Sequence, residues 1–85
     1  MNFRIIFEKE PEKYLRRQNK QTQSRILKAI NALPDNGDIK KLTGTNGLFR
    51  VRIGNVRVIF SVDRVNGIID IVAMGSRGQT YRDFL

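Results

Sequence analysis

One stretch of the sequence, residues 48–63, constrains the fold more than any other, because apolar and basic residues alternate in it on both sides of a Gly-Asn pair. Alternation with a period of two is typical of a β-strand that has one face in the core. The Gly54-Asn55 pair indicates a two-residue hairpin turn of type II′, since glycine tolerates the positive φ of the first turn position. We therefore expect a β-hairpin in which Ile53 pairs with Val56.

This register places three arginines on one side of the hairpin. Arg52 is expected opposite Arg57, with Arg50 on the same side two residues earlier. We call Arg50, Arg52 and Arg57 the arginine face. Guanidinium groups stay charged and repel one another, so we expect this face to bind an anion. The alternative is that the arginines form the solvated outer side of an antiparallel sheet. The opposite, core side is expected to hold Phe49, Val51, Ile53, Val56, Val58, Phe60 and Val62.

The charge balance favours an anionic partner. The chain has 16 Lys and Arg against 8 Asp and Glu, which gives a net charge of +8 at pH 7. Nucleic acid is the commonest polyanion for a small basic domain, because phosphate neutralisation releases counterions, and an acidic protein is the alternative. Without histidine, acid–base chemistry near neutral pH must come from Tyr, Lys, Arg, Asp or Glu.

Length and composition bound the remaining classes. Eighty-five residues predict one domain, 1–85. The lack of cysteine argues against a disulfide scaffold and a thiolate metal site, and no cofactor or metal is expected. No apolar run is long enough to span a bilayer and no leader is visible, so we expect a cytoplasmic protein without membrane contact.

The rest of the pattern predicts an α+β fold. We expect an N-terminal strand, two helices packed on one face of the sheet, a three-stranded antiparallel meander and a short C-terminal element. The predicted bounds are a strand at 3–7, a helix from Pro11 to about Asn19, a helix from about Gln21 to Leu33, a polar connection at 35–47, the hairpin, and a strand at 68–75.

The meander depends on a second turn. Asn66-Gly67 is typical of a two-residue type I′ turn. Its register puts Ile59 and Met74 on the arginine face as an apolar floor, which lowers the local dielectric around a bound phosphate. The expected core pairs are Phe60 with Ala73 and Val62 with Ile71.

Further basic and aromatic residues flank the hairpin. Lys40 and Lys41 precede it, and Arg77, Tyr81 and Arg82 follow it. We expect Lys40, Lys41 and Arg82 to contact RNA phosphates and Tyr81 to stack on an unpaired base. The alternatives are a solvated loop for the two lysines and a C-terminal anchor on the sheet edge for Tyr81.

Arg77 needs a change of register to join the arginine face. Strict alternation puts Ser76 on the side of Arg57. Arg77 reaches that side only if the strand ends or bulges at Gly75, which glycine permits but does not require.

Three motifs also carry a family resemblance. They are Leu42 with Gly44, the run Phe49-Arg-Val-Arg-Ile-Gly-Asn-Val-Arg-Val-Ile-Phe, and Gly75-Ser-Arg followed by Tyr81. Together they resemble the RelE family of toxins from prokaryotic toxin–antitoxin modules, and the order of elements is similar over essentially the whole chain. The resemblance implies an endoribonuclease that enters the ribosomal A site, cuts the mRNA codon by 2′-hydroxyl attack and stops translation.

The resemblance also implies a role for each site residue. Arg50 and Arg52 hold and polarise the scissile phosphate, and Arg57 stabilises the transition state. Arg77 has a phosphate or proton-donor role, and Tyr81 is a stacking platform or general base. The sequence lacks the His or Glu base of some relatives, which leaves the version of the site built from basic residues and Tyr81.

The resemblance implies partners and leaves alternatives. A cognate antitoxin is expected to wrap the toxin, with the surface of the first helix and the sheet edges as docking places. The free toxin is expected to be a monomer that acts on the ribosome and mRNA, and to meet operator DNA only through the antitoxin complex. A ParE-like inhibitor of DNA gyrase, or an inactive relative that only binds its antitoxin, remains the alternative.

Overall fold

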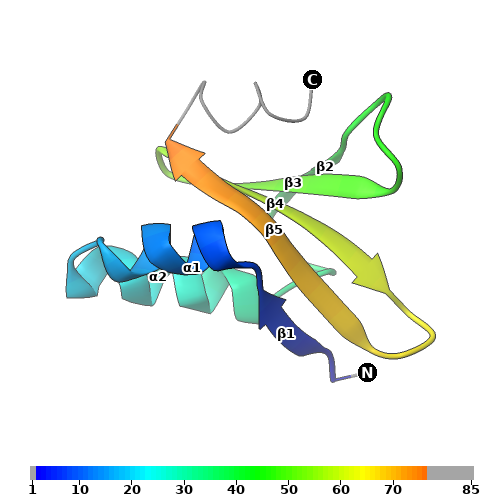
Figure 1. Cartoon of the computed structure of the whole chain (residues 1–85), viewed down its shortest axis with the longest axis horizontal. Helices are drawn as coiled ribbons and strands as arrows, with labels where there is room; N and C mark the ends of the chain where they lie inside the picture. Colours follow the sequence, from blue (N-terminus) through cyan, green and yellow to red (C-terminus); the bar gives the residue numbers. More distant parts are fainter. Residues whose placement is uncertain (1, 77–85) are drawn as a thin grey trace.

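A five-stranded sheet carries two helices on one of its faces (Figure 1) in this computed structural model, which describes residues 2–76. The strand order is β1-β5-β4-β3-β2, with β1 parallel to β5 and the other neighbours antiparallel. The predicted α+β class is confirmed, whereas the predicted C-terminal element lies outside the described residues. The elements are β1 (Arg4–Phe7), α1 (Lys9–Arg16), α2 (Lys20–Asn31), β2 (Asp38–Lys41), β3 (Leu48–Ile53), β4 (Val56–Asp63) and β5 (Ile68–Ser76).

The two helices meet at Asn19. It caps the N-terminus of α2, where its side-chain oxygen accepts a hydrogen bond from the Thr22 amide at 2.8 Å. Helix α1 therefore ends before the predicted Asn19, because that residue starts the next helix. Ile26 and Ile30, one turn apart on α2, are completely buried against the sheet. Within residues 2–76 no helix has the length and apolar character needed to cross a bilayer.

The predicted polar connection at 35–47 is wrong in its first half. Residues 38–41 form β2, which pairs antiparallel with β3. The sheet therefore extends by one strand beyond the predicted three-stranded meander. Ile39 lies opposite Val51 and packs against the core, which is the reason that this short segment is held in the sheet. Its alternation is too brief to stand out from the polar residues around it.

The β3–β4 hairpin has the predicted register. Ile53 pairs with Val56 and Arg52 with Arg57. Gly54 has φ of 59°, as the first position of a type II′ turn requires.

The predicted turn at Asn66-Gly67 is wrong, because Asp63 closes a longer loop. Its carboxylate accepts hydrogen bonds from the amides of Val65 and Asn66 at 3.1 and 3.0 Å and from the Asn66 side chain at 2.8 Å. These bonds, the one from the Asn66 side chain first, lower the pKa of Asp63. Asp63 consequently pairs with Ile68. The observed core pairs are Phe60 with Ile71 and Val62 with Ile69, in place of the predicted ones.

A β-bulge then shifts the upper half of β5. Phe60 pairs with Ile71 but Ile59 with Ala73, so Val72 is the extra residue. Beyond the bulge Met74 pairs with Val58 and joins the core, and the prediction that Met74 lies on the arginine face is wrong. Ile59 does lie there, completely buried.

The core lies between the helices and the inner face of the sheet. The rings of Phe49 and Phe60 stack with centroids 5.7 Å apart. The buried cluster comprises Ile26, Ile30, Leu33, Val51, Val56, Val58, Phe60, Ile69, Ile71 and Met74.

Two carboxyl groups meet where β1 passes into α1. Asp70 of β5, first through a hydrogen bond and then through its like charge, raises the pKa of Glu8 above its ordinary value of 4.5. The folded chain therefore binds this proton more tightly than the unfolded chain. The stability that comes with the proton is present below the unfolded pKa and is lost as the pH rises through the folded pKa.

Glu8→Gln should accordingly raise the melting temperature at neutral pH, because it removes the repulsion from Asp70. The gain should shrink as the pH falls toward 4.5, where Glu8 holds its proton in the wild type as well. Thermal unfolding followed by circular dichroism across this pH range measures the effect. Glu10→Gln, which changes an exposed carboxylate in the first turn of α1, is the control and should show no such gain. A gain that is largest at acidic pH would contradict the assignment.

Candidate functional site

The arginine face lies on the side of the sheet away from the helices. Arg50 and Arg52 come from β3 and Arg57 from the neighbouring β4, with Arg52 directly opposite Arg57 and Arg50 opposite Ile59. Cross-strand partners point to the same side of a sheet, so the hairpin brings the three guanidinium groups together as the alternation predicts.

The three arginines differ in burial. Arg50 is only 6% exposed and packs beside the buried Ile59, whereas Arg57 is half-buried and the Arg52 side chain is 46% exposed. The Nε of Arg50 is buried and has no hydrogen-bond partner among the described residues. A buried guanidinium with an unused donor loses hydration without full compensation, which is the state expected of a site that awaits an anion.

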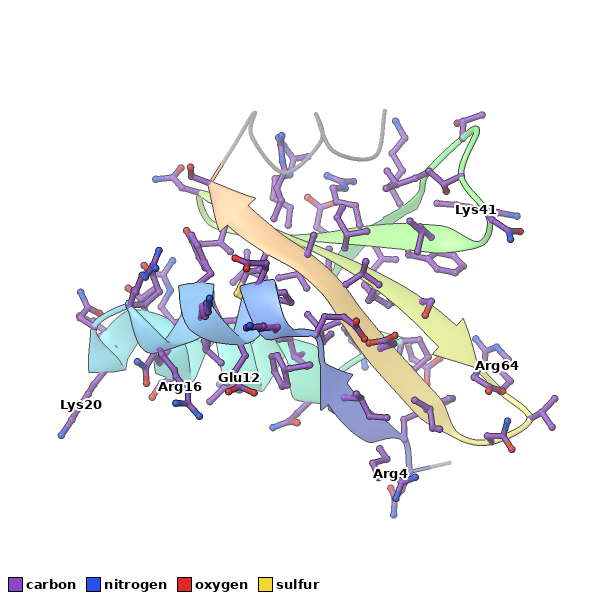
Figure 2. All side chains as sticks on the ribbon, viewed as in Figure 1. Arg4, Glu12, Arg16, Lys20, Lys41 and Arg64 are labelled. Atoms are coloured by element: carbon purple, nitrogen blue, oxygen red, sulfur yellow. The ribbon has the colours of Figure 1, made fainter. Side chains whose placement is uncertain are left out.

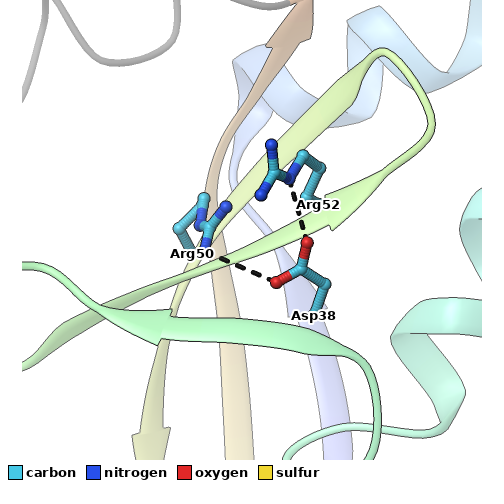
Figure 3. A network of polar contacts seen from close by, with 3 residues as sticks. All are labelled: Asp38, Arg50 and Arg52. Atoms are coloured by element: carbon cyan, nitrogen blue, oxygen red, sulfur yellow. Dashed lines mark hydrogen bonds and ion pairs between the residues drawn. The ribbon is translucent and has the colours of Figure 1, made fainter.

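Asp38, which the sequence analysis does not single out, contacts two of these arginines (Figure 3). Its Oδ2 accepts a hydrogen bond from Arg52 Nε at 2.9 Å, and its Oδ1 lies 3.7 Å from Arg50 Nη2. Asp38 reaches them because it faces Arg52 across the β2–β3 ladder. The only sequence signal for this contact is the brief alternation of Asp38, Ile39 and Lys40.

The two candidate lysines separate on β2. Lys40 pairs with Arg50 and therefore shares the arginine face, whereas Lys41 pairs with Phe49 and belongs to the other side of the strand. Figure 2 shows Lys41 beside the loop that joins β2 to β3. The structure thus adds Lys40 to the cluster through strand register rather than through a loop.

The end of β5 completes the described part of the face. The bulge puts Ala73 opposite Ile59 and Gly75 opposite Arg57, while Ser76 pairs with Val56 on the core side. The predicted place of Ser76 beside Arg57 is therefore wrong, and the bulge occurs before Gly75 rather than at it. The remaining candidates, Arg77, Tyr81 and Arg82, lie outside the described residues.

The cluster has the chemistry of a phosphate site. Lys40 and the three arginines outnumber the carboxylate of Asp38, and guanidinium groups donate hydrogen bonds in a planar fork that matches phosphate oxygens. The buried Ile59 lies on the same side of the sheet as these basic side chains. It lowers the local dielectric and strengthens their electrostatic attraction to a bound anion. Fixed cations of this kind stabilise negative charge that develops on a phosphate during transfer.

A known protein family and several solved structures match this chain. A family model described as the ParE toxin of the type II toxin–antitoxin system parDE matches residues 2–81. The chain belongs to the RelE/ParE toxin superfamily. The resemblance to RelE toxins predicted from the sequence is confirmed by solved RelE structures.

Two archaeal RelE complexes are similar to this toxin over almost its full length. A chain of the RelE–RelB complex from Pyrococcus horikoshii OT3 is 31% identical, with a TM-score of 0.75 and coverage of 93% of this chain and 99% of that chain. A chain of the RelB–RelE antitoxin–toxin complex from Methanococcus jannaschii is 27% identical, with a TM-score of 0.73 and coverage of 94% of this chain and 99% of that chain. A mutant of E. coli RelE in the free state, 14% identical over the whole of both chains with a TM-score of 0.73, shares the fold. No curated protein sequence matches.

Proposed function

We propose that this toxin is a ribosome-dependent endoribonuclease that cuts mRNA in the A site. The observation that carries the proposal is the arginine face, in which Arg50, Arg52 and Arg57 lie on one side of two adjacent strands and Arg50 is buried. Cleavage by the ribose 2′-hydroxyl passes through a phosphorane with extra negative charge, and cations fixed in advance stabilise that charge more than the charge of the bound substrate.

In this mechanism the 2′-oxygen attacks the adjacent phosphorus and loses its proton, while the bond from phosphorus to the 5′-oxygen breaks. The products are a 2′,3′-cyclic phosphate and a 5′-hydroxyl end. Arg50 and Arg52 hold the scissile phosphate, and Arg57 stabilises the transition state. Tyr81 serves as stacking platform or general base, and Arg77 contacts the phosphate or protonates the leaving oxygen.

The register of β5 favours this role for Arg77. Ser76 pairs on the core side, so it does not compete for the position beside Arg57. Lys40 extends the cationic surface along β2 toward RNA phosphates, and Lys41 and Arg82 are proposed to contact RNA around it.

Primer extension on translating ribosomes tests the proposal. The wild type should produce cuts within the A-site codon, and Arg57→Ala should slow them by about 10²-fold, because the phosphorane loses one fixed cation. Arg64→Ala removes an exposed arginine just beyond β4 and is the matched control, with wild-type cutting expected. Absence of cuts by the wild type, or full cutting by a protein carrying both Arg57→Ala and Tyr81→Ala, would overturn the proposal.

The second candidate is inhibition of DNA gyrase, because the matching family model is described as a ParE toxin. A supercoiling assay with purified gyrase separates the two activities. Inhibition of supercoiling without mRNA cleavage would reverse the ranking.

We also propose a cognate antitoxin as the cellular partner. The archaeal relatives were crystallised with RelB antitoxins. The exposed surface of α1 and the edge strands β1 and β2 of the described sheet are the docking places that the fold offers to such a chain.

A further inference from the structure

The pairing of β2 with β3 fixes the position of Asp38. It lies opposite Arg52 in the β2–β3 register, and its two oxygens approach two different arginines (Figure 3). The contact with Arg52 Nε, at 2.9 Å, is a hydrogen bond, whereas the 3.7 Å approach to Arg50 Nη2 is too long for one. A single carboxylate therefore serves two cations and satisfies only one of them.

Arg50 is the arginine whose charge and hydrogen-bond donors Asp38 satisfies less well. Its side chain is 7% exposed and its Nε has no hydrogen-bond partner among residues 2–76. A phosphate group carries more oxygens than a carboxylate and accepts hydrogen bonds from several directions, so it can satisfy both guanidinium groups at once. Asp38, with 55% of its side chain exposed on an edge strand, can turn toward water when such a group arrives.

We infer that Asp38 is the internal counter-ion of an anion site formed by Arg50 and Arg52, and that a phosphate group of the ligand replaces it there. The identity of the ligand as RNA rests on the proposed function, whereas the exchange itself concerns any phosphate. While the site is empty, Asp38 reduces the repulsion between the arginines. When a ligand arrives, Asp38 competes with it for the guanidinium groups of Arg50 and Arg52.

Asp38→Asn removes the competing charge and keeps the shape of the side chain. We expect it to bind inorganic pyrophosphate about five- to tenfold more tightly than the wild type, because no carboxylate has to be displaced. It should also melt at a lower temperature, because the buried Arg50 loses its nearby carboxylate. Isothermal titration calorimetry at one fixed salt concentration measures the affinity.

Asp35→Asn is the matched control. It makes the same change in net charge at an exposed position in the turn before β2, so its affinity for pyrophosphate should stay within about twofold of the wild type. Equal affinities of the Asp38→Asn and Asp35→Asn proteins would overturn the exchange. Weaker binding by Asp38→Asn would also overturn it and would make Asp38 a positioning residue for Arg52.

The wild type provides a test that does not depend on a variant. Addition of pyrophosphate should shift the NMR signals of the Arg50 and Arg52 Nε–H groups together with that of the Asp38 carboxyl carbon. Arginine shifts without a change at Asp38 would contradict the exchange. If the binding results are as expected but mRNA stays intact on the ribosome, the proposed ribonuclease function fails while the anion site stands.

Discussion

Replacement of Arg50 by methionine should strongly slow RNA cleavage without weakening the fold. Arg50 is buried beside Ile59, its Nε lacks a partner among the described residues, and its nearest carboxylate is 3.7 Å away. Methionine has a similar length and no charge to desolvate. Buried ion pairs replaced by apolar side chains often leave stability unchanged or raise it by about 1–4 kcal/mol.

The loss of activity follows from the same burial. A cation in a low-dielectric position acts strongly on the phosphorane, so Arg50→Met should slow A-site cleavage by about 10²–10³-fold. Asp38 keeps its hydrogen bond to Arg52 in this variant, so no carboxylate is stranded.

Primer extension time courses and urea unfolding measure the two effects on the same preparation. Arg64→Met, at an exposed loop position, is the control and should change neither quantity. A variant that cuts at the wild-type rate but loses several kcal/mol of unfolding free energy would show that Arg50 is structural rather than functional.

Phe60→Ala should bring the toxin close to unfolding. Phe60 is completely buried at the centre of β4, stacks on Phe49 and packs in the cluster that joins the sheet to α2. Removal of a buried phenyl ring costs about 3–5 kcal/mol, because the cavity refills only in part. For a domain of this size the melting temperature should fall by more than about 10 °C.

Thermal and urea unfolding check this prediction. Val65→Ala, at a side chain that is 91% exposed, is the control and should alter stability by less than about 0.5 kcal/mol. A loss below about 1 kcal/mol in Phe60→Ala would mean that the sheet and helices are not held by this cluster.

The predictability of the two turns differs for a physical reason. Gly54-Asn55 fixes the β3–β4 register locally, so Arg52 opposite Arg57 follows from the sequence. Asn66-Gly67 carries an equally strong local signal, but the Asp63 carboxylate captures the loop amides and lengthens the turn. Side-chain hydrogen bonds of this kind compete with turn propensity and are not visible in an alternation pattern.

The candidate site was predictable only where it rests on that hairpin. The bulge at Val72 lies just beyond Ile71, the last β5 residue that pairs with the parallel β1, and no local sequence pattern encodes it. The charge of Lys40 is evident in the sequence, but its place opposite Arg50 depends on the formation of β2. The sequence does not predict the role of Asp38, because its contact is with Arg52, a cross-strand neighbour fourteen residues away.

The chemistry of the cut ends tests the central claim most directly. Ribosomes carrying an mRNA with a known A-site codon are incubated with the purified wild-type toxin, and the ends of the mRNA fragments are mapped and identified. We predict breaks within the A-site codon that leave a 2′,3′-cyclic phosphate on one fragment and a 5′-hydroxyl on the other. Intact mRNA, together with inhibition of gyrase supercoiling by the same preparation, would contradict the proposal that the arginine face cleaves RNA.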